Sequence, residues 1–306
     1  MRRKIVSFKK VPAISTPFPL FLQFYISMKK KILFLVIFSG FHFFSNAQYG
    51  QYDTAKTVPP FRIFDNLYYV GIDWVSSYIL TTSDGLILID ALYGKYPSHI
   101  LQSVHDLGFD VNQIKYILCT HAHYDHYEGA DTLQRLTHAR VGMTDPDWQM
   151  VEGKVKTGLE SVKAHLIRDL VIHDGDSLRL GNTTVRFYQT PGHTLGVLSI
   201  AFPVRDGNNI YKAFVFGGAG QNFSGVLQTE MYIKSIDRLL GMKDIEVNIS
   251  NHPSLGKIFE RAEFLKQRKP GQVNPFVAPE DFQIWLKELR TQAEDKLIEE
   301  KKKDTR

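Results

Sequence analysis

The segment HAHYDH at residues 121–126 places His121, His123, Asp125 and His126 within six positions of one another. Neutral imidazoles combined with a carboxylate are ligands that a borderline-soft divalent ion such as zinc selects, and three protein ligands per ion leave one position open for water. The alternative is a polar loop whose histidines are solvated. Four potential ligands in so short a segment favour metal binding over that alternative.

The elements around this segment indicate how further ligands could reach it. It follows the apolar run at residues 114–119, which is typical of a buried strand, and a loop leaving such a strand can present side chains to a cleft. His193 lies between predicted strands beside Gly192, and His252 directly follows a predicted strand. Either could be an ordinary histidine if taken alone. Their placement at strand ends predicts that both contribute to the same site.

Hydrophobic periodicity predicts a chain of alternating strands and helices. We expect strands at 67–70, 77–81, 86–90, 114–119, 140–143, 184–188, 197–202, 213–216 and 245–249. We expect helices ending near 108, beginning near Glu128, and at about 228–241, 255–268 and 279–300. Turn residues at 83–85 and 206–209 predict hairpins, whereas residues 145–170 favour a loop with helical pieces. Two strand-rich halves, each with flanking helices, predict a four-layer α/β (αββα) sandwich.

Charge is unevenly distributed along the 306 residues. The formal net charge is +5, but residues 1–47 contain eight Lys or Arg and no Asp or Glu. The remaining chain therefore holds 29 basic and 32 acidic residues, so its composition gives no support for nucleic-acid binding.

The basic N-terminal region has the features of a secretion signal. A positive run at Met28–Lys31 precedes an apolar run, and Ser45-Asn46-Ala47 has small residues at the positions that a signal peptidase reads. We expect a signal peptide at 28–47, cleaved after Ala47, which leaves a single periplasmic or secreted domain at 48–306 with no membrane segment. An uncleaved anchor is the alternative. Residues 1–27 fit no leader pattern, so we expect an upstream extension outside the fold, with Met28 as an alternative start.

Cys119 is the only cysteine, so the chain cannot form an intrachain disulfide. Its position inside a predicted buried strand predicts a small core residue rather than a reactive thiol.

Four motifs together make the chain resemble the metallo-β-lactamase superfamily over residues 60–268. They are YILTTSDGLILID at 78–90, HAHYDH at 121–126, Gly192-His193-Thr194 and His252-Pro253. The resemblance implies an αββα fold with two Zn²⁺ per chain. It assigns one ion to His121, His123 and His193, and the other to Asp125, His126 and His252. Asp90, at the end of its strand, would orient a ligand, although an ordinary strand-end aspartate is the alternative.

The segment at 217–222 distinguishes between branches of the superfamily. Many relatives place a bridging aspartate or a cysteine there, and this sequence (GGAGQN) has neither. The implied ligand set therefore resembles that of the third subclass of class B β-lactamases. His123 argues against the oxygen-reducing di-iron branch, which has a glutamate at that position. The lack of a long nucleic-acid-binding insertion argues against the tRNA-processing branch.

The resemblance implies a zinc-dependent hydrolase that opens the β-lactam ring of antibiotics. A metal-bound hydroxide would attack the amide carbonyl, and Asp125 would orient it. The alternatives are a hydrolase of another substrate, such as a lactone or a thioester, and a non-catalytic metal-binding protein. A complete set of six ligands argues against the last alternative.

The expected substrate pocket departs from that subclass. The subclass commonly has a serine near 217–222 that receives the substrate carboxylate, and Gln221, Asn222 or Ser224 could replace it here. Leu195 stands where the subclass usually has proline. Trp74 and Tyr127 could line the cleft or belong to the core. We expect the six other histidines to lie on the surface, and they include His99, His138 and His173.

Overall fold

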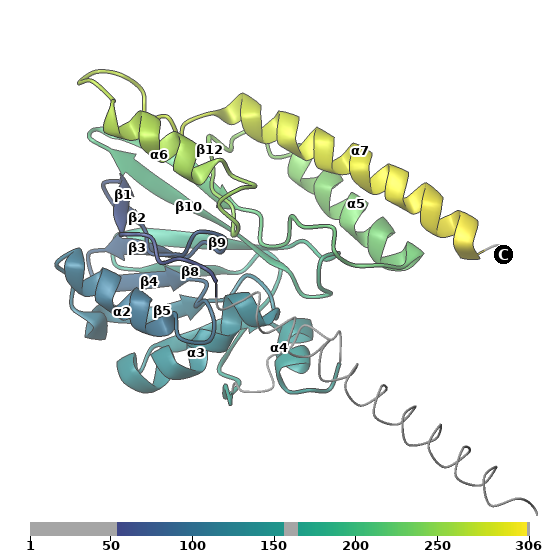
Figure 1. Ribbon diagram of the computed structural model, residues 1–306, viewed down its shortest axis with the longest axis horizontal. Coiled ribbons are helices and arrows are strands. Elements are labelled where there is room, and N and C mark those ends of the chain that lie inside the picture. The colour runs from purple at the N-terminus through teal and green to yellow at the C-terminus, as the bar shows by residue number, and fades with distance from the viewer. Residues whose placement is uncertain (1–53, 156–164, 305–306) are drawn as a thin grey trace, which may run out of the picture. The chain divides into compact units, whose positions relative to one another are not determined.

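The computed structural model describes residues 54–155 and 165–304, and residues from Lys56 onward form one compact unit. Two β-sheets pack face to face, with α2 and α3 on the outer side of one and α5 and α7 on the outer side of the other (Figure 1). This is the predicted four-layer arrangement. The predicted signal peptide and upstream extension lie outside the described residues. Within those residues, no helix combines the length and apolarity that crossing a bilayer requires.

The first sheet has seven strands in sequence order, from β1 to β7. Their bounds are Phe61–Phe64, Leu67–Tyr69, Tyr78–Thr82, Gly85–Ile89, Ile114–Leu118, Arg140–Thr144 and Leu170–Ile172. Strands β1 to β4 pair antiparallel, and β4 to β7 pair parallel. The predicted hairpin at 83–85 is confirmed, because Thr82 pairs with Gly85.

The second sheet has five strands in the order β12-β11-β10-β9-β8. The bounds of β8 to β12 are Ser177–Leu180, Thr183–Gln189, Leu198–Asp206, Asn209–Val215 and Val247–Asn248. All pairs are antiparallel except β11 with β12. The predicted hairpin at 206–209 is confirmed by the pairing of Asp206 with Asn209.

The helices cover the outer faces of the two sheets. Those that follow strands of the first sheet are α2 (Pro97–Asp106), η1 (Val111–Gln113), α3 (Tyr124–Thr137) and α4 (Asp145–Val151). Helices α5 (Val226–Leu240) and α7 (Pro279–Asp304) pack on the second sheet, whereas α6 (Ile258–Lys266) packs against the core between the two sheets.

Side-chain alternation in β10 shows how the layers are joined. Leu198, Ile200, Phe202 and Val204 point into the core between the two sheets. Ala201, on the opposite face of the strand, packs into a second apolar cluster with residues of α5 and α7. A two-residue period is expected of a strand covered on both faces. The sheets are therefore rigidly stacked, and loops at their shared edge have fixed relative positions.

Several predicted boundaries were wrong. Helix α3 begins at Tyr124 rather than near Glu128, because His123 is extended and Asp125 places negative charge in the first turn, where the helix dipole favours it. Strand β12 covers only two of the five residues expected. Strands β1, β7 and β8 were not predicted; β8 is an edge strand with mixed side chains that forms by pairing with β9.

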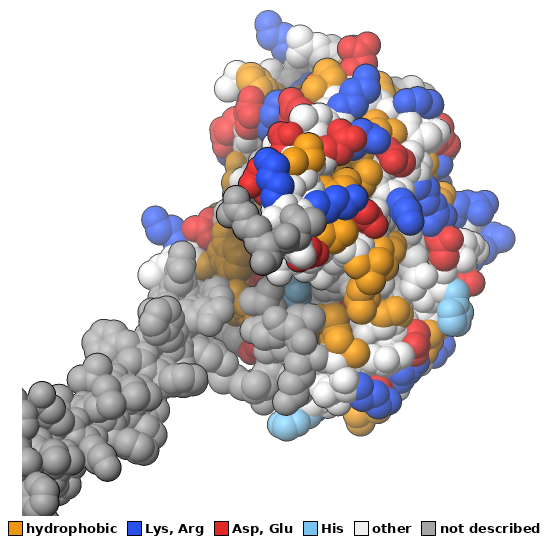
Figure 2. All heavy atoms as spheres, turned by 90° about the vertical axis from the view of Figure 1, so that its right-hand side faces the viewer, with side chains coloured by type: hydrophobic (Ala, Val, Ile, Leu, Met, Phe, Trp, Pro, Cys, Tyr) orange, Lys and Arg blue, Asp and Glu red, His pale blue; other side chains and the backbone are white. Residues whose placement is uncertain are grey.

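Charged side chains form no patch of a single sign on the face shown in Figure 2. Lys and Arg are interspersed there with Asp and Glu, and hydrophobic side chains run between them. This face therefore lacks the continuous basic stripe that nucleic-acid binding requires.

Candidate metal centre

The candidate ligands gather where strand ends of both sheets meet. Strands β4, β5 and β6 run parallel, so Asp90 and the 121–126 segment follow the same edge of the first sheet. In the second sheet, the loops that carry His193 and His252 leave the ends of β9 and β12, which point the same way. The two edges are joined directly, since the Leu198 amide donates to the Thr120 carbonyl over 2.7 Å.

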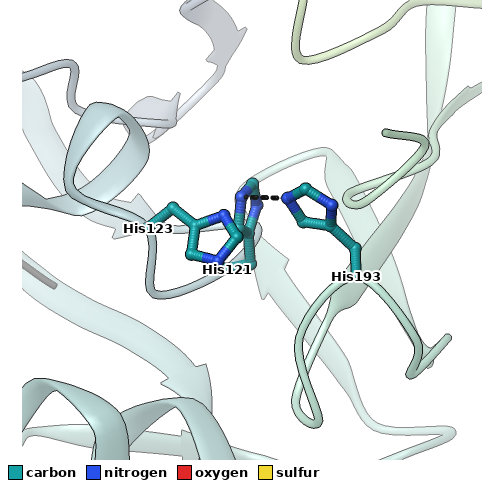
Figure 3. A group of neighbouring side chains, drawn as sticks. All are labelled: His121, His123 and His193. Carbon is teal, nitrogen blue, oxygen red and sulfur yellow. Dashed lines mark hydrogen bonds between the residues drawn. The ribbon is translucent and has the colours of Figure 1, made fainter. Parts of the chain in front are cut away.

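His121, His123 and His193 form the first group (Figure 3). His121 and His123 approach from the β5–α3 connection, and His193 faces them from the loop after β9. All three are buried, and their candidate ligand atoms lie within 4.8 Å of one another. The Nε2 atoms of His121 and His193 are 3.0 Å apart. The three imidazoles thus converge on one point, as ligands of a single ion must.

Asp125, His126 and His252 form the second group, whose candidate ligand atoms also lie within 4.8 Å of one another. His126 Nε2 is 3.2 Å from Asp125 Oδ2 and 3.3 Å from His252 Nε2. The two groups adjoin, because the ring centroids of His121 and His126 are only 4.2 Å apart. The structure therefore brings all six predicted ligands together in two neighbouring sets of three.

Asp90 contacts one of these ligands directly. Its Oδ2 accepts from His126 Nδ1 over 2.8 Å, and its Oδ1 accepts from the Thr120 amide over 2.7 Å. The residue has φ 60°, a left-handed conformation that aspartate tolerates better than most residues. Asp90 thus fixes the ring of His126, and the alternative of an ordinary strand-end aspartate does not describe it.

Three further Nδ1 atoms are occupied in the same way. His193 Nδ1 lies 2.7 Å from the Gly220 carbonyl, and His252 Nδ1 lies 2.7 Å from the Trp74 carbonyl. The Thr120 hydroxyl donates to Asp90, so it can accept from His121 Nδ1 at 3.1 Å. Metal-binding histidines commonly donate their second ring nitrogen to such an acceptor. The arrangement directs Nε2 of His121, His126, His193 and His252 towards the centre.

Helix α5 holds the segment that carries His193. Gln228 donates to the Gly192 carbonyl over 2.7 Å, and Ser235 donates to the Pro191 carbonyl over 2.7 Å. Gly192 has φ 147°, and a Cβ on it would lie 2.4 Å from Cβ of Tyr232. Glycine is therefore required for the close approach of this loop to α5.

The two groups differ in their electrostatics. Burial, reinforced by the neighbouring imidazoles, holds the pKa of His121 and His193 well below the ordinary value, so both are neutral. Burial has the same effect on His126, but the Asp125 and Asp90 carboxylates outweigh it and raise its pKa to about 10. Burial also disfavours the ionised Asp125, yet His126 and His252 keep its pKa below the ordinary value. The second group must therefore release a proton when it binds a cation.

The structure also places the other residues that the sequence singled out. Gln221 donates to the Leu289 carbonyl of α7, so its amide is engaged away from the predicted substrate pocket. Tyr127 is a core residue, whereas Trp74 stacks on His252 with ring centroids 5.6 Å apart. His138 and His173 are exposed as predicted, but His99 is half-buried, with Nε2 3.0 Å from the Gly71 carbonyl.

Cys119 directly follows β5 and is buried, in agreement with its predicted place in the core. Asp147, a buried carboxylate in α4 that contacts both loops of the first group, was not predicted from the sequence. Its sequence neighbourhood is weakly periodic. The only local signal is the acidic pair around Pro146, which is common at helix starts.

Known proteins share both the family pattern and the fold. The metallo-beta-lactamase superfamily model matches residues 71–206. BJP-1, a subclass B3 metallo-beta-lactamase of Bradyrhizobium japonicum, is 29% identical with a TM-score of 0.71, covering 80% of this chain and 96% of that one. FEZ-1 of Legionella gormanii is 27% identical with a TM-score of 0.74, covering 81% and 98%.

A curated relative carries the name of a different hydrolase. The hydroxyacylglutathione hydrolase of Maricaulis maris is 30% identical over 146 residues, which cover 47% of this chain and 49% of the relative. The chain thus spans about half the length of the first curated relatives that it matches.

Proposed function

We propose that this chain, whose residues 71–206 match the metallo-beta-lactamase superfamily model, is a hydrolase of that superfamily and opens β-lactams with two bound zinc ions. The observation that carries the proposal is the composition of the second group. Asp125, His126 and His252 complete it, while residues 217–222 contain no carboxylate or thiol. This set resembles that of the third subclass of β-lactamases, in line with the similarity to BJP-1 along most of both chains.

The donor atoms fit zinc. Each group offers three nitrogen or carboxylate ligands, the number that the protein supplies in catalytic zinc sites. When bound, zinc would supply a water that is ionised near neutral pH, and the ion would also polarise a substrate carbonyl. His121, His123 and His193 would hold one ion, and Asp125, His126 and His252 the other.

The residues of the chain provide positioning and proton handling. Asp125 stays ionised, since the neighbouring imidazoles keep its pKa low, and its carboxylate can orient the attacking water and accept a proton. Trp74 covers one side of His252 and fixes that ring through its backbone carbonyl. A half-buried aromatic surface therefore lies beside the second group.

Asn222 and Ser224 remain as candidates to bind the substrate carboxylate. Both are exposed, whereas the amide of Gln221 is bonded to α7. Asn222 Oδ1 and His193 Cε1 lie 3.1 Å and 3.4 Å, respectively, from where a Cβ on Gly220 would be. The Asn222 amide is thus close to the first group, where it could donate to a substrate oxygen.

Thioester hydrolysis is the second candidate. It is favoured by the similarity to the hydroxyacylglutathione hydrolase of Maricaulis maris over 146 residues of this chain. Both reactions need the same attack on a carbonyl carbon, so the metal ligands do not separate them. The two reactions differ in the leaving group and in the residues that bind the rest of the substrate.

Parallel assays of the purified protein test the choice. We expect turnover of a chromogenic cephalosporin that a metal chelator abolishes and added zinc restores. A hydroxyacylglutathione and an acyl-homoserine lactone serve as competing substrates under identical conditions. Preferential turnover of the thioester or the lactone would replace the β-lactamase proposal, and turnover of none would leave the chain without the proposed activity.

The predicted signal peptide adds an exported location to this proposal. β-Lactams act outside the cytoplasm, so a secreted or periplasmic enzyme would meet its substrate there. No membrane or nucleic-acid partner is part of the proposal.

A further inference from the structure

Asp147 is a buried carboxylate, 1% exposed, in the first turn of α4. Its Oδ2 accepts from the Ala122 amide over 2.9 Å and from the Thr194 hydroxyl over 3.0 Å. Its Oδ1 accepts from the Gly196 amide over 3.1 Å. One side chain is therefore bonded to two loops that lie more than 60 residues apart in the sequence.

Those two loops carry all three histidines of the first group. Ala122 lies between His121 and His123, and Thr194 directly follows His193. We infer that Asp147 is a positioning residue that joins the two loops and sets the spacing of these three imidazoles. The inference rests on the proposed function, because it assigns Asp147 to the same metal centre.

The backbone closes tightly around this carboxylate. A Cβ on Gly196 would lie 2.6 Å from Asp147 Oδ1 and 2.3 Å from the Thr144 hydroxyl oxygen. The Thr144 hydroxyl also donates to the Gly196 carbonyl. Residues at the end of β6 and the start of α4 thus form hydrogen bonds with both the amide and the carbonyl of Gly196. The absence of a Cβ on glycine permits this close approach.

Hydrogen bonds alone stabilise the Asp147 carboxylate. Among the described residues, no Lys or Arg forms an ion pair with it, and burial raises its pKa to about 7 against the effect of its three donors. A buried carboxyl group that lacks such partners is strongly disfavoured. The donors and the carboxyl group therefore hold one another in place, and a change at Asp147 must displace both loops.

Zinc titration of paired variants tests this role without a substrate. His252→Ala serves as the background, because it leaves the second group one ligand short and makes the first group the main zinc site. In this background we expect Asp147→Asn to lower zinc affinity about tenfold, as loss of groups that orient ligands usually does. Asparagine keeps the shape but directs an NH₂ group at one of the present donors.

Asp145→Asn is the matched control. Asp145 lies in the same helix, pairs with Arg168 and Gln149, and contacts neither loop. We expect it to leave zinc affinity unchanged. The melting temperature of each metal-free variant is measured in parallel, because a purely structural role would lower it without changing zinc affinity. That pattern would overturn the inference.

Thr194→Val provides a second test should Asp147→Asn fail to fold. It keeps the branched shape and removes one donor to Asp147, and we expect zinc affinity to fall roughly threefold. Unchanged affinity would refute the positioning role. If the unaltered chain binds zinc but hydrolyses no β-lactam, only the proposed substrate fails. A chain that binds no zinc would overturn both proposals.

Discussion

Replacing His121 by alanine is expected to lower kcat/KM for the substrate of this protein by about 10³-fold or more, since the chemistry of a bound metal is worth several kcal/mol. His121 is buried at the centre of the first group, 3.0 Å from His193. Its removal leaves two imidazoles, which are too few to hold a zinc ion firmly. We expect the purified variant to contain about one metal ion fewer per chain.

The control for this change is His105→Ala, which removes an imidazole that is 81% exposed in α2. It should retain the activity and metal content of the unaltered protein. Circular dichroism of both variants checks that each is folded. A His121→Ala protein that keeps more than a tenth of the activity would contradict its assignment as a ligand.

Replacing Asp90 by asparagine is expected to weaken zinc binding at the second group by about 10- to 100-fold, as loss of a carboxylate that orients a ligating histidine typically does. Asp90 Oδ2 accepts from both His126 Nδ1 and the Thr120 hydroxyl, and a neutral amide cannot reproduce both contacts and the charge. Asparagine tolerates the left-handed backbone of this residue, so added strain does not explain the loss.

Competitive zinc titration measures this effect. Asp84→Asn, in the exposed turn between β3 and β4, is the control, since Asp84 bonds Ser83 and lies away from the centre. The first group should lose less zinc affinity than the second, because Asp90 reaches His121 only through the Thr120 hydroxyl. An equal loss of zinc affinity at both groups would show that Asp90 stabilises the whole sheet edge and does not act specifically by orienting His126.

The candidate ligands could be predicted because their signals are local. Imidazole and carboxylate side chains are dense at 121–126, and His193 and His252 each adjoin a residue typical of turns, Gly192 and Pro253. A turn at the end of a strand places its side chains at the sheet edge, so convergence could be inferred before distances were known. The four-layer sandwich could also be predicted, because the hydrophobic periodicity of the strands and helices is itself a local signal.

Other features depend on contacts that no short segment encodes. Asp147 is bonded to residues 25 and 49 positions away, so its role is visible only once α4 is packed against both loops. The side chain of Gln221 turns towards α7, a partner 68 residues further along. The start of α3 was missed because its first turn is made of the candidate ligands themselves, which are typical of a loop.

Anomalous diffraction from crystals grown with zinc tests the central claim most directly. Two peaks are expected, roughly 3.5–4 Å apart as in two-metal sites. One should be bound by His121, His123 and His193, and the other by Asp125, His126 and His252. An absence of peaks among these side chains, or a structure in which His193 or His252 points away from residues 121–126, would contradict the account.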